Sequence, residues 1–162
     1  MTQRYDLVVL DAYTIGGQIP FHLTTLEFMR ELKAILKPGG VVLANINSAL
    51  EGPRSMILRS EYKTMASVFP ELYLFPLGAA PITEDDTEEL QRRRNVILVA
   101  VADQRSLVRE QVVELSDRLV AAGKVKTTNF ANDARQLFTR RVNTTNVPLL
   151  TDDYAPVDTM LF

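Results

Sequence analysis

The stretch YDLVVLDAY, residues 5–13, decides how the rest of the chain is interpreted. Residues 7–10 are consecutive apolar residues, and the carboxylate of Asp11 follows them directly. An unbroken apolar run is typical of a strand that is covered on both faces, as in a parallel sheet. In open α/β sheets, the carboxyl ends of such strands line the ligand crevice. The stretch therefore predicts a buried strand that presents Asp11 to a functional site.

The bulk composition excludes several classes of protein. The chain has 162 residues, which suits one domain, and its net charge of -2 leaves no overall basic surface for nucleic acid. It has no cysteine, which excludes disulfides, thiolate metal sites and a cysteine nucleophile. No apolar run approaches the roughly 18 residues of a membrane helix. We therefore expect a cytoplasmic protein with neither nucleic acid nor membrane as a partner.

Strand and helix patterns alternate along the first two thirds of the chain. Thr24 and Glu27 have the spacing of a capping box, and Pro38-Gly39-Gly40 is expected to end the helix that they begin. Residues 78–94 are polar and are expected to form a surface loop. The pattern predicts strands at 5–11, 41–46, 72–77 and 95–102, and helices near 24–37, 53–69, 108–123 and 130–141.

This order predicts an α/β fold of about four strands with flanking helices. The first three strands alternate with helices and should be parallel, whereas the fourth follows without a helix and should be antiparallel. Pro76 places the third strand at a sheet edge. We expect one partial domain over 1–162, which divides into the sheet with its crossover helices (5–102), two C-terminal helices (103–142) and a terminal segment (143–162).

Three stretches carry a resemblance to a known family. They are YDLVVLDAY, IPFHLTTLEFMRELKAILKPGGVVLANI and LLTDDYAPVDTML. Together they resemble bacterial spermidine-synthase-like proteins, the polyamine aminopropyltransferases, over about residues 5–101 and 149–161. The resemblance implies the C-terminal half of a Rossmann-like class I methyltransferase sheet, in which the last strand is reversed. It also implies transfer of an aminopropyl group from decarboxylated S-adenosylmethionine to an amine.

The family's glycine-rich loop and its ribose-binding acid have no counterpart in these 162 residues. Gly16-Gly17 and Gly39-Gly40 do not replace that loop, because neither pair follows a strand and opens a helix. We therefore expect no cofactor on this chain alone, with decarboxylated S-adenosylmethionine or S-adenosylmethionine as co-substrate of the complete fold. The expected partners are a second copy or a complementary N-terminal half, together with a small amine.

Asp11 is the candidate catalytic residue. The resemblance implies that it deprotonates or orients the attacking amine, whereas capping of the following loop is the structural alternative. Tyr13, Thr14 and Gln18 lie in the loop that would contact substrate, and simple exposure of this loop to solvent is the alternative for Tyr13 and Gln18. Thr14 stands where the family has a second Asp, which leaves methyl transfer on the same scaffold as a second hypothesis. A non-catalytic assembly or binding module is the third.

The terminal segment supplies the other candidates. Asp152, Asp153 and Tyr154 are expected at the mouth of the site by resemblance, and a simple turn is the alternative. His22 is the only histidine, and one histidine cannot build a metal site, so we expect no metal and a structural role for this residue.

Overall fold

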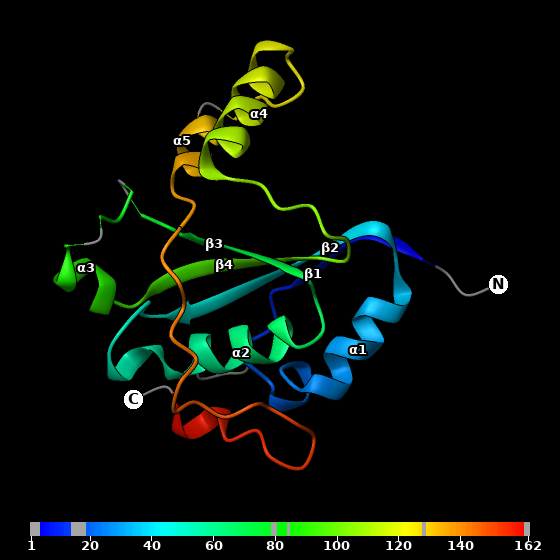
Figure 1. The fold of residues 1–162 in the computed structure, drawn as a ribbon, viewed down its shortest axis with the longest axis vertical. Helices are drawn as coiled ribbons and strands as arrows, with labels where there is room; N and C mark the ends of the chain where they lie inside the picture. Colours follow the sequence, from blue (N-terminus) through cyan, green and yellow to red (C-terminus); the bar gives the residue numbers. More distant parts are fainter. Residues whose placement is uncertain (1–3, 14–18, 79–80, 84, 128, 161–162) are drawn as a thin grey trace.

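A four-stranded sheet forms the centre of the molecule (Figure 1). The computed structural model describes residues 4–13, 19–78, 81–83, 85–127 and 129–160. The strands are β1 (Tyr5–Leu10), β2 (Leu36–Ser48), β3 (Glu71–Pro76) and β4 (Arg94–Val101), in the spatial order β1-β2-β4-β3. β1 pairs in parallel with β2, and β4 is antiparallel to both β2 and β3. The predicted arrangement of three strands in one direction and a reversed fourth is confirmed, with β3 at an edge.

Helices cover one face of the sheet. α1 (Leu26–Ile35) and α2 (Met56–Ala66) lie on this face, and the C-terminal segment lies beyond them (Figure 1). Leu150 fixes this segment, because its carbonyl accepts a 2.8 Å bond from Leu26 N and its amide donates a 3.0 Å bond to Thr64 Oγ1. The core beneath the sheet is fully buried and includes Met29, Val42, Ile46, Leu58, Met65, Val96, Leu98 and Leu150.

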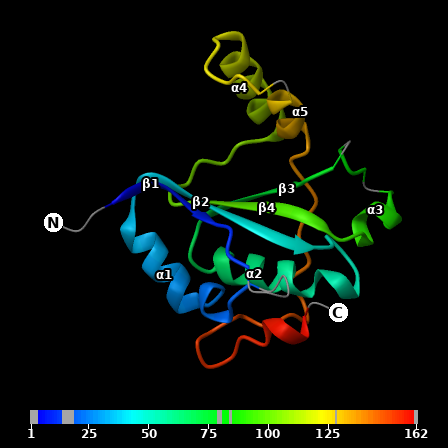
Figure 2. The ribbon, with the colours of Figure 1, turned by 180° about the vertical axis from the view of Figure 1, so that it is seen from behind.

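The other face of the sheet is only half-covered. Leu7 is 50% exposed and Val9 is 59% exposed, so the expectation that this strand is covered on both faces is wrong. α4 (Arg109–Ala121) and α5 (Phe130–Arg135) pack on each other and project away from this side of the sheet (Figure 2). Apolar side chains of α4 are consequently open to solvent, and Leu115 is 45% exposed.

The start of α1 differs from the capping-box prediction by one residue. Thr25 is the N-cap, and its hydroxyl accepts a 3.3 Å bond from Phe28 N, while the hydroxyl of Thr24 donates to Phe21 O. Glu27 does not close a capping box, because its Oε2 accepts instead from the amide of Asp152. Local spacing predicted that the Glu27 side chain would complete the capping box, but in the structure this side chain bonds to the C-terminal segment.

The other boundaries shift for similar reasons. α1 ends at Ile35, and Pro38-Gly39-Gly40 lies inside β2 at an irregularity where Tyr5 pairs with Leu36 but Leu7 pairs with Val41. The expected loop at 78–94 contains the short helix α3 (Thr87–Gln91), which Asp86 caps. The expected helix at 130–141 ends at Arg135, and Phe138 N instead donates to Leu74 O on the edge strand β3.

We expect the open edge at β1 to cause self-association. β1 has no strand on its outer side among the described residues, and Leu7 and Val9 expose apolar surface there. Open apolar edges recruit other strands, so the isolated chain should form a homodimer, with the two β1 strands as the proposed contact. Val9→Lys should shift the mass measured by light scattering toward a monomer, whereas Val9→Thr should not. A wild-type chain that remains an 18.2 kDa monomer at high concentration would refute this prediction.

Candidate functional site

Asp11, Tyr13 and Asn45 form a connected group at the carboxyl end of β1. Leu10 pairs with Ala44, so Asp11 follows β1 beside Asn45 of β2. The amide nitrogen Nδ2 of Asn45 donates a 3.0 Å hydrogen bond to Asp11 Oδ1, and the hydroxyl of Tyr13 donates a 2.6 Å bond to the carbonyl of Asn45. We call these three residues the edge cluster. Asp11 is exposed, and among the described residues only Asn45 donates to its carboxylate, through Oδ1.

The phenol of Tyr13 stays protonated throughout the neutral range. Partial burial, with smaller contributions from the nearby carboxylates of Asp11 and Glu61, raises the pKa of Tyr13 to about 12, against a lowering by a backbone hydrogen bond of Asn47. A neutral phenol can donate a hydrogen bond but cannot act as a base near pH 7. Within the edge cluster, Asp11 is therefore the group that can accept a proton.

Glu61 is a buried acid on α2 whose charge acts on Tyr13. It is 2% exposed, and its Oε1 atom is buried without a hydrogen-bond partner in the described part of the chain. Burial raises the pKa of Glu61 to about 8, so this carboxyl is mainly protonated at pH 7. Asn45 Oδ1 is likewise buried and unpartnered among the described residues.

Asparagines continue the polar edge from β2 to β4. Asn47 Nδ2 donates a 3.1 Å bond to Asn95 Oδ1, and Arg93 Nη2 donates a 3.4 Å bond to the carbonyl of Asn47. The carboxyl ends of β1 and β2 and the start of β4 thus present carboxylate, amide and guanidinium groups in one row. Such a row can orient a polar substrate along the sheet edge.

The terminal candidates lie apart from the edge cluster. Asp152 and Asp153 form the tip of a tight turn in which Thr151 and Tyr154 exchange two 3.0 Å backbone bonds. Both Asp side chains are exposed, and Tyr154 is 60% exposed. The turn is attached to α1 through the 3.0 Å bond from Asp152 N to Glu27 Oε2. No hydrogen bond or ion pair of the described residues joins it to Asp11, so a substrate role for these three residues remains a prediction.

Of the other candidates, two lie outside the described residues. These are Thr14 and Gln18. His22 is exposed in the short helix Phe21–Leu23, where its ring contacts that of Phe21 edge-on at 5.6 Å. No group of three metal-ligating side chains occurs within the described ranges. None of the described helices has the length and hydropathy needed to cross a membrane.

The sequence contained signals for three residues that its interpretation missed, namely Asn45, Asn47 and Glu61. Asn45 and Asn47 alternate with buried Ala44 and Ile46, which places both amides on the open face of β2. Glu61 lies three residues after Leu58 and four before Met65, the spacing of one helix face, and all three are buried. An acid at an apolar helix position is a signal of an unusual environment.

Curated relatives resemble part of the chain. It is 41% identical over 75 residues to the polyamine aminopropyltransferase of Vibrio vulnificus, a match that covers 46% of this chain and 23% of the relative. A probable polyamine aminopropyl transferase of Bifidobacterium longum is 38% identical over 66 residues, 41% of this chain and 14% of the relative. The N-terminal histidine N-methyltransferase of Emericella nidulans is 35% identical over 79 residues, 49% of this chain and 13% of the relative. No family model matches the chain.

Solved structures define the fold class. A probable spermidine synthase from Corynebacterium glutamicum has a TM-score of 0.52 at 21% identity, covering 88% of this chain and 50% of that one. Human methyltransferase-like protein 13 has a TM-score of 0.53 at 21% identity, covering 90% of this chain and 54% of that one. The fold is therefore of the class I methyltransferase type. In sequence the chain is spermidine-synthase-like, and it spans about half of the structural neighbours and under a quarter of the curated relatives.

The described glycines do not form a cradle for the nucleotide of a co-substrate. Gly39 (φ 72) lies against Arg105 and Asp103, Gly52 (φ 76) lies against Gln91, and Gly123 (φ 65) follows the end of α4. None of these three glycines lies in a glycine-rich turn between a strand and a helix N-terminus, the geometry that binds phosphate and nucleotide groups. The edge cluster can contact an acceptor, but these residues do not fit the adenosyl co-substrate.

We therefore expect the 162-residue chain alone to bind S-adenosylmethionine and its decarboxylated form very weakly. Titration calorimetry with each compound measures this directly. A dissociation constant near 1 μM, a binding free energy of about -8 kcal/mol, would contradict the expectation and place a nucleotide site on these residues.

Proposed function

We propose that this chain supplies the acceptor side of an aminopropyltransferase, which moves an aminopropyl group from decarboxylated S-adenosylmethionine to an amine in the cytoplasm. The strongest support is the position of Asp11, which follows β1 beside Asn45. One of its carboxylate oxygens accepts no hydrogen bond from a described residue. The partial matches to two aminopropyltransferases point to the same chemistry. The reaction would then belong to polyamine biosynthesis.

In this proposal, Asp11 prepares the nucleophile. An ammonium group has no lone pair, so its proton must leave before nitrogen attacks the carbon bonded to the sulfonium sulfur. The C–N bond would form as that C–S bond breaks, and the bonding electron pair would leave with sulfur as a neutral thioether. Asp11 accepts or directs that proton while Asn45 fixes the carboxylate. The neutral phenol of Tyr13 packs beside them and narrows the space for the amine. The co-substrate supplies the electrophilic carbon, and residues beyond those described would hold its nucleoside.

Methyl transfer is the second candidate. Thr14 replaces the second Asp of the family pattern, and one partial relative is named an N-terminal histidine N-methyltransferase. The same deprotonation by Asp11 would serve an amine that attacks a methyl group. A binding module without catalysis is the third candidate, and it would need none of the edge cluster.

The decisive experiment joins residues 1–162 to a matching N-terminal half. The product is incubated with a panel of amines and with either decarboxylated S-adenosylmethionine or S-adenosylmethionine, and the acceptor is analysed by mass spectrometry. Aminopropylated product with the first donor only supports the proposal. Methylated product with the second donor only supports methyl transfer, and no product with either leaves the binding module as the explanation.

A further inference from the structure

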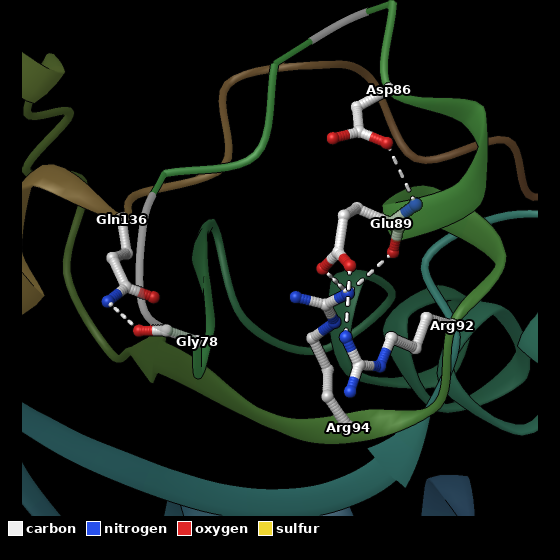
Figure 3. A network of polar contacts seen from close by, with 6 residues as sticks. All are labelled: Gly78, Asp86, Glu89, Arg92, Arg94 and Gln136. Carbon is white, nitrogen blue, oxygen red and sulfur yellow. Dashed lines mark hydrogen bonds and ion pairs between the residues drawn. The ribbon is translucent and has the colours of Figure 1, made fainter.

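A second polar hollow lies at the far end of the same sheet edge. It has a volume of about 450 Å³ and lies between the loop after β3 and the helix α3. Figure 3 shows Arg94 at its base, with Asp86, Glu89 and Arg92 on the α3 side. The hollow borders the start of β4, and β4 pairs with β2, the strand that carries Asn45 of the edge cluster.

Arg94 is a buried cation that is only partly satisfied. Its side chain is 8% exposed, and Nη2 donates to the carbonyl of Glu89 at 2.7 Å and to Glu89 Oε2 at 2.6 Å. Nε is buried without a partner in the described part of the chain, and no bond from Nη1 to a described residue is found. In Figure 3, the terminal nitrogen of Arg94 that has no dashed line lies on the side where Gly78 and Gln136 are drawn.

Contacts on both sides of the hollow hold Arg94 and Gly78 in place. Glu89 accepts from Arg92 as well as from Arg94, which lowers the pKa of its carboxyl and keeps it charged. On the opposite wall, Gln136 Nε2 donates a 2.7 Å bond to Gly78 O and anchors the loop to the end of α5 (Figure 3). The Arg94 guanidinium and Gly78 are thus held by protein contacts before any ligand arrives, which reduces the ordering cost of binding.

The charges around the hollow select a ligand with one negative charge. Three arginines and two carboxylates line it, a net of one positive charge. A phosphate dianion would meet Asp86 and Glu89 with two charges, whereas a carboxylate brings one and matches the planar edge of a guanidinium. We propose that this hollow is a binding site for a small monocarboxylate, held by Nη1 of the Arg94 guanidinium.

Nitrogen-15 NMR of the labelled 162-residue chain tests this with acetate as the probe. Sodium acetate replaces sodium chloride at constant ionic strength, and the Arg94 Nε–H signal is followed with the amides of Gly78 and Ile82, which line the hollow. We expect saturable shifts with a millimolar dissociation constant. Shifts that stay linear, or that arise equally at exposed arginines such as Arg105, would overturn the proposal.

Two variants of different kinds complete the test. Arg94→Lys keeps the charge but loses the planar fork, and it should weaken acetate binding at least about tenfold. Leu77→Trp fills the hollow from a residue that is 43% exposed and alters no charge, and it should have the same effect. Arg105→Lys is the control and should bind as the wild type does. Wild-type affinity in Leu77→Trp, or tighter binding of inorganic phosphate than of acetate, would show that the assignment is wrong.

Discussion

Replacing Asp11 by Asn is expected to lower turnover by about 10²–10⁴-fold in a protein that joins residues 1–162 to a matching N-terminal half, the usual contribution of a general acid or base. Asn keeps the shape of Asp and an oxygen that can accept from Asn45 Nδ2, now 3.0 Å away. It removes the charge that takes the proton. Since Asp11 is exposed, the melting temperature should change little. The measurement is steady-state turnover beside a thermal melt.

Asp6→Asn is the matched control, because Asp6 is an exposed acid on the same strand. It pairs with Lys37 at 2.7 Å at the other end of β1, far from the edge cluster. The turnover of the Asp6→Asn variant should stay within about twofold of the wild-type value, since exposed ion pairs contribute little to stability. If Asp11→Asn lowers the melting temperature but keeps its turnover, Asp11 only supports the loop. Thr14→Asp provides a separate readout, and it should improve the use of diamine acceptors if that position selects them.

Glu61→Gln is expected to remove a large pH dependence of stability. In the unfolded chain the pKa of Glu61 is near 4.5, and burial raises it to about 8 in the folded chain. Between these values the folded state binds more protons, so the free energy of unfolding falls as the pH rises from 4.5 to 8 and then levels off. This pKa shift corresponds to a decrease in the free energy of unfolding of at most about 5 kcal/mol between pH 4.5 and pH 8. Gln is neutral at every pH and should abolish this part of the slope.

Urea denaturation at intervals between pH 4.5 and pH 8.5 measures the effect. Glu31→Gln is the control, because Glu31 is an exposed acid on α1 and its removal should leave the wild-type slope intact. Comparing the variants cancels the contributions of all other titrating groups. A Glu61→Gln slope equal to that of the wild type would mean that the carboxyl finds a partner or water in the folded state.

The Glu61 result also bears on the edge cluster. The charge of this carboxyl is one of the causes that raise the pKa of Tyr13. Ionisation above about pH 8 would add a negative charge near the site where an amine is expected to bind. The cationic form of the acceptor would then be stabilised, which opposes the deprotonation assigned to Asp11.

Local pattern was sufficient for the strands and for their directions. The apolar runs at residues 7–10 and 96–102 predicted β1 and β4. Pro76 placed β3 at an edge, because proline has no amide hydrogen to donate within the middle of a sheet. The absence of a long helix between β3 and β4 predicted the reversed strand, since a parallel connection needs a crossover. These features depend on neighbours in the chain, so the sequence alone contained them.

Contacts between distant residues were decided only by the tertiary structure. Thr24 and Thr25 are equal candidates for a cap, and the bond from Asp152 N to Glu27 removed the side chain that favoured Thr24. Nothing in the run Arg92–Arg94 indicates which guanidinium is buried, because α3 must fold back before Glu89 can reach Arg94. Asp11 was predicted at a strand end, but its partner Asn45 lies 34 residues away and is defined by strand register. The sequence determined which elements form, whereas burial and pairing between those elements determined the environment of each charged group.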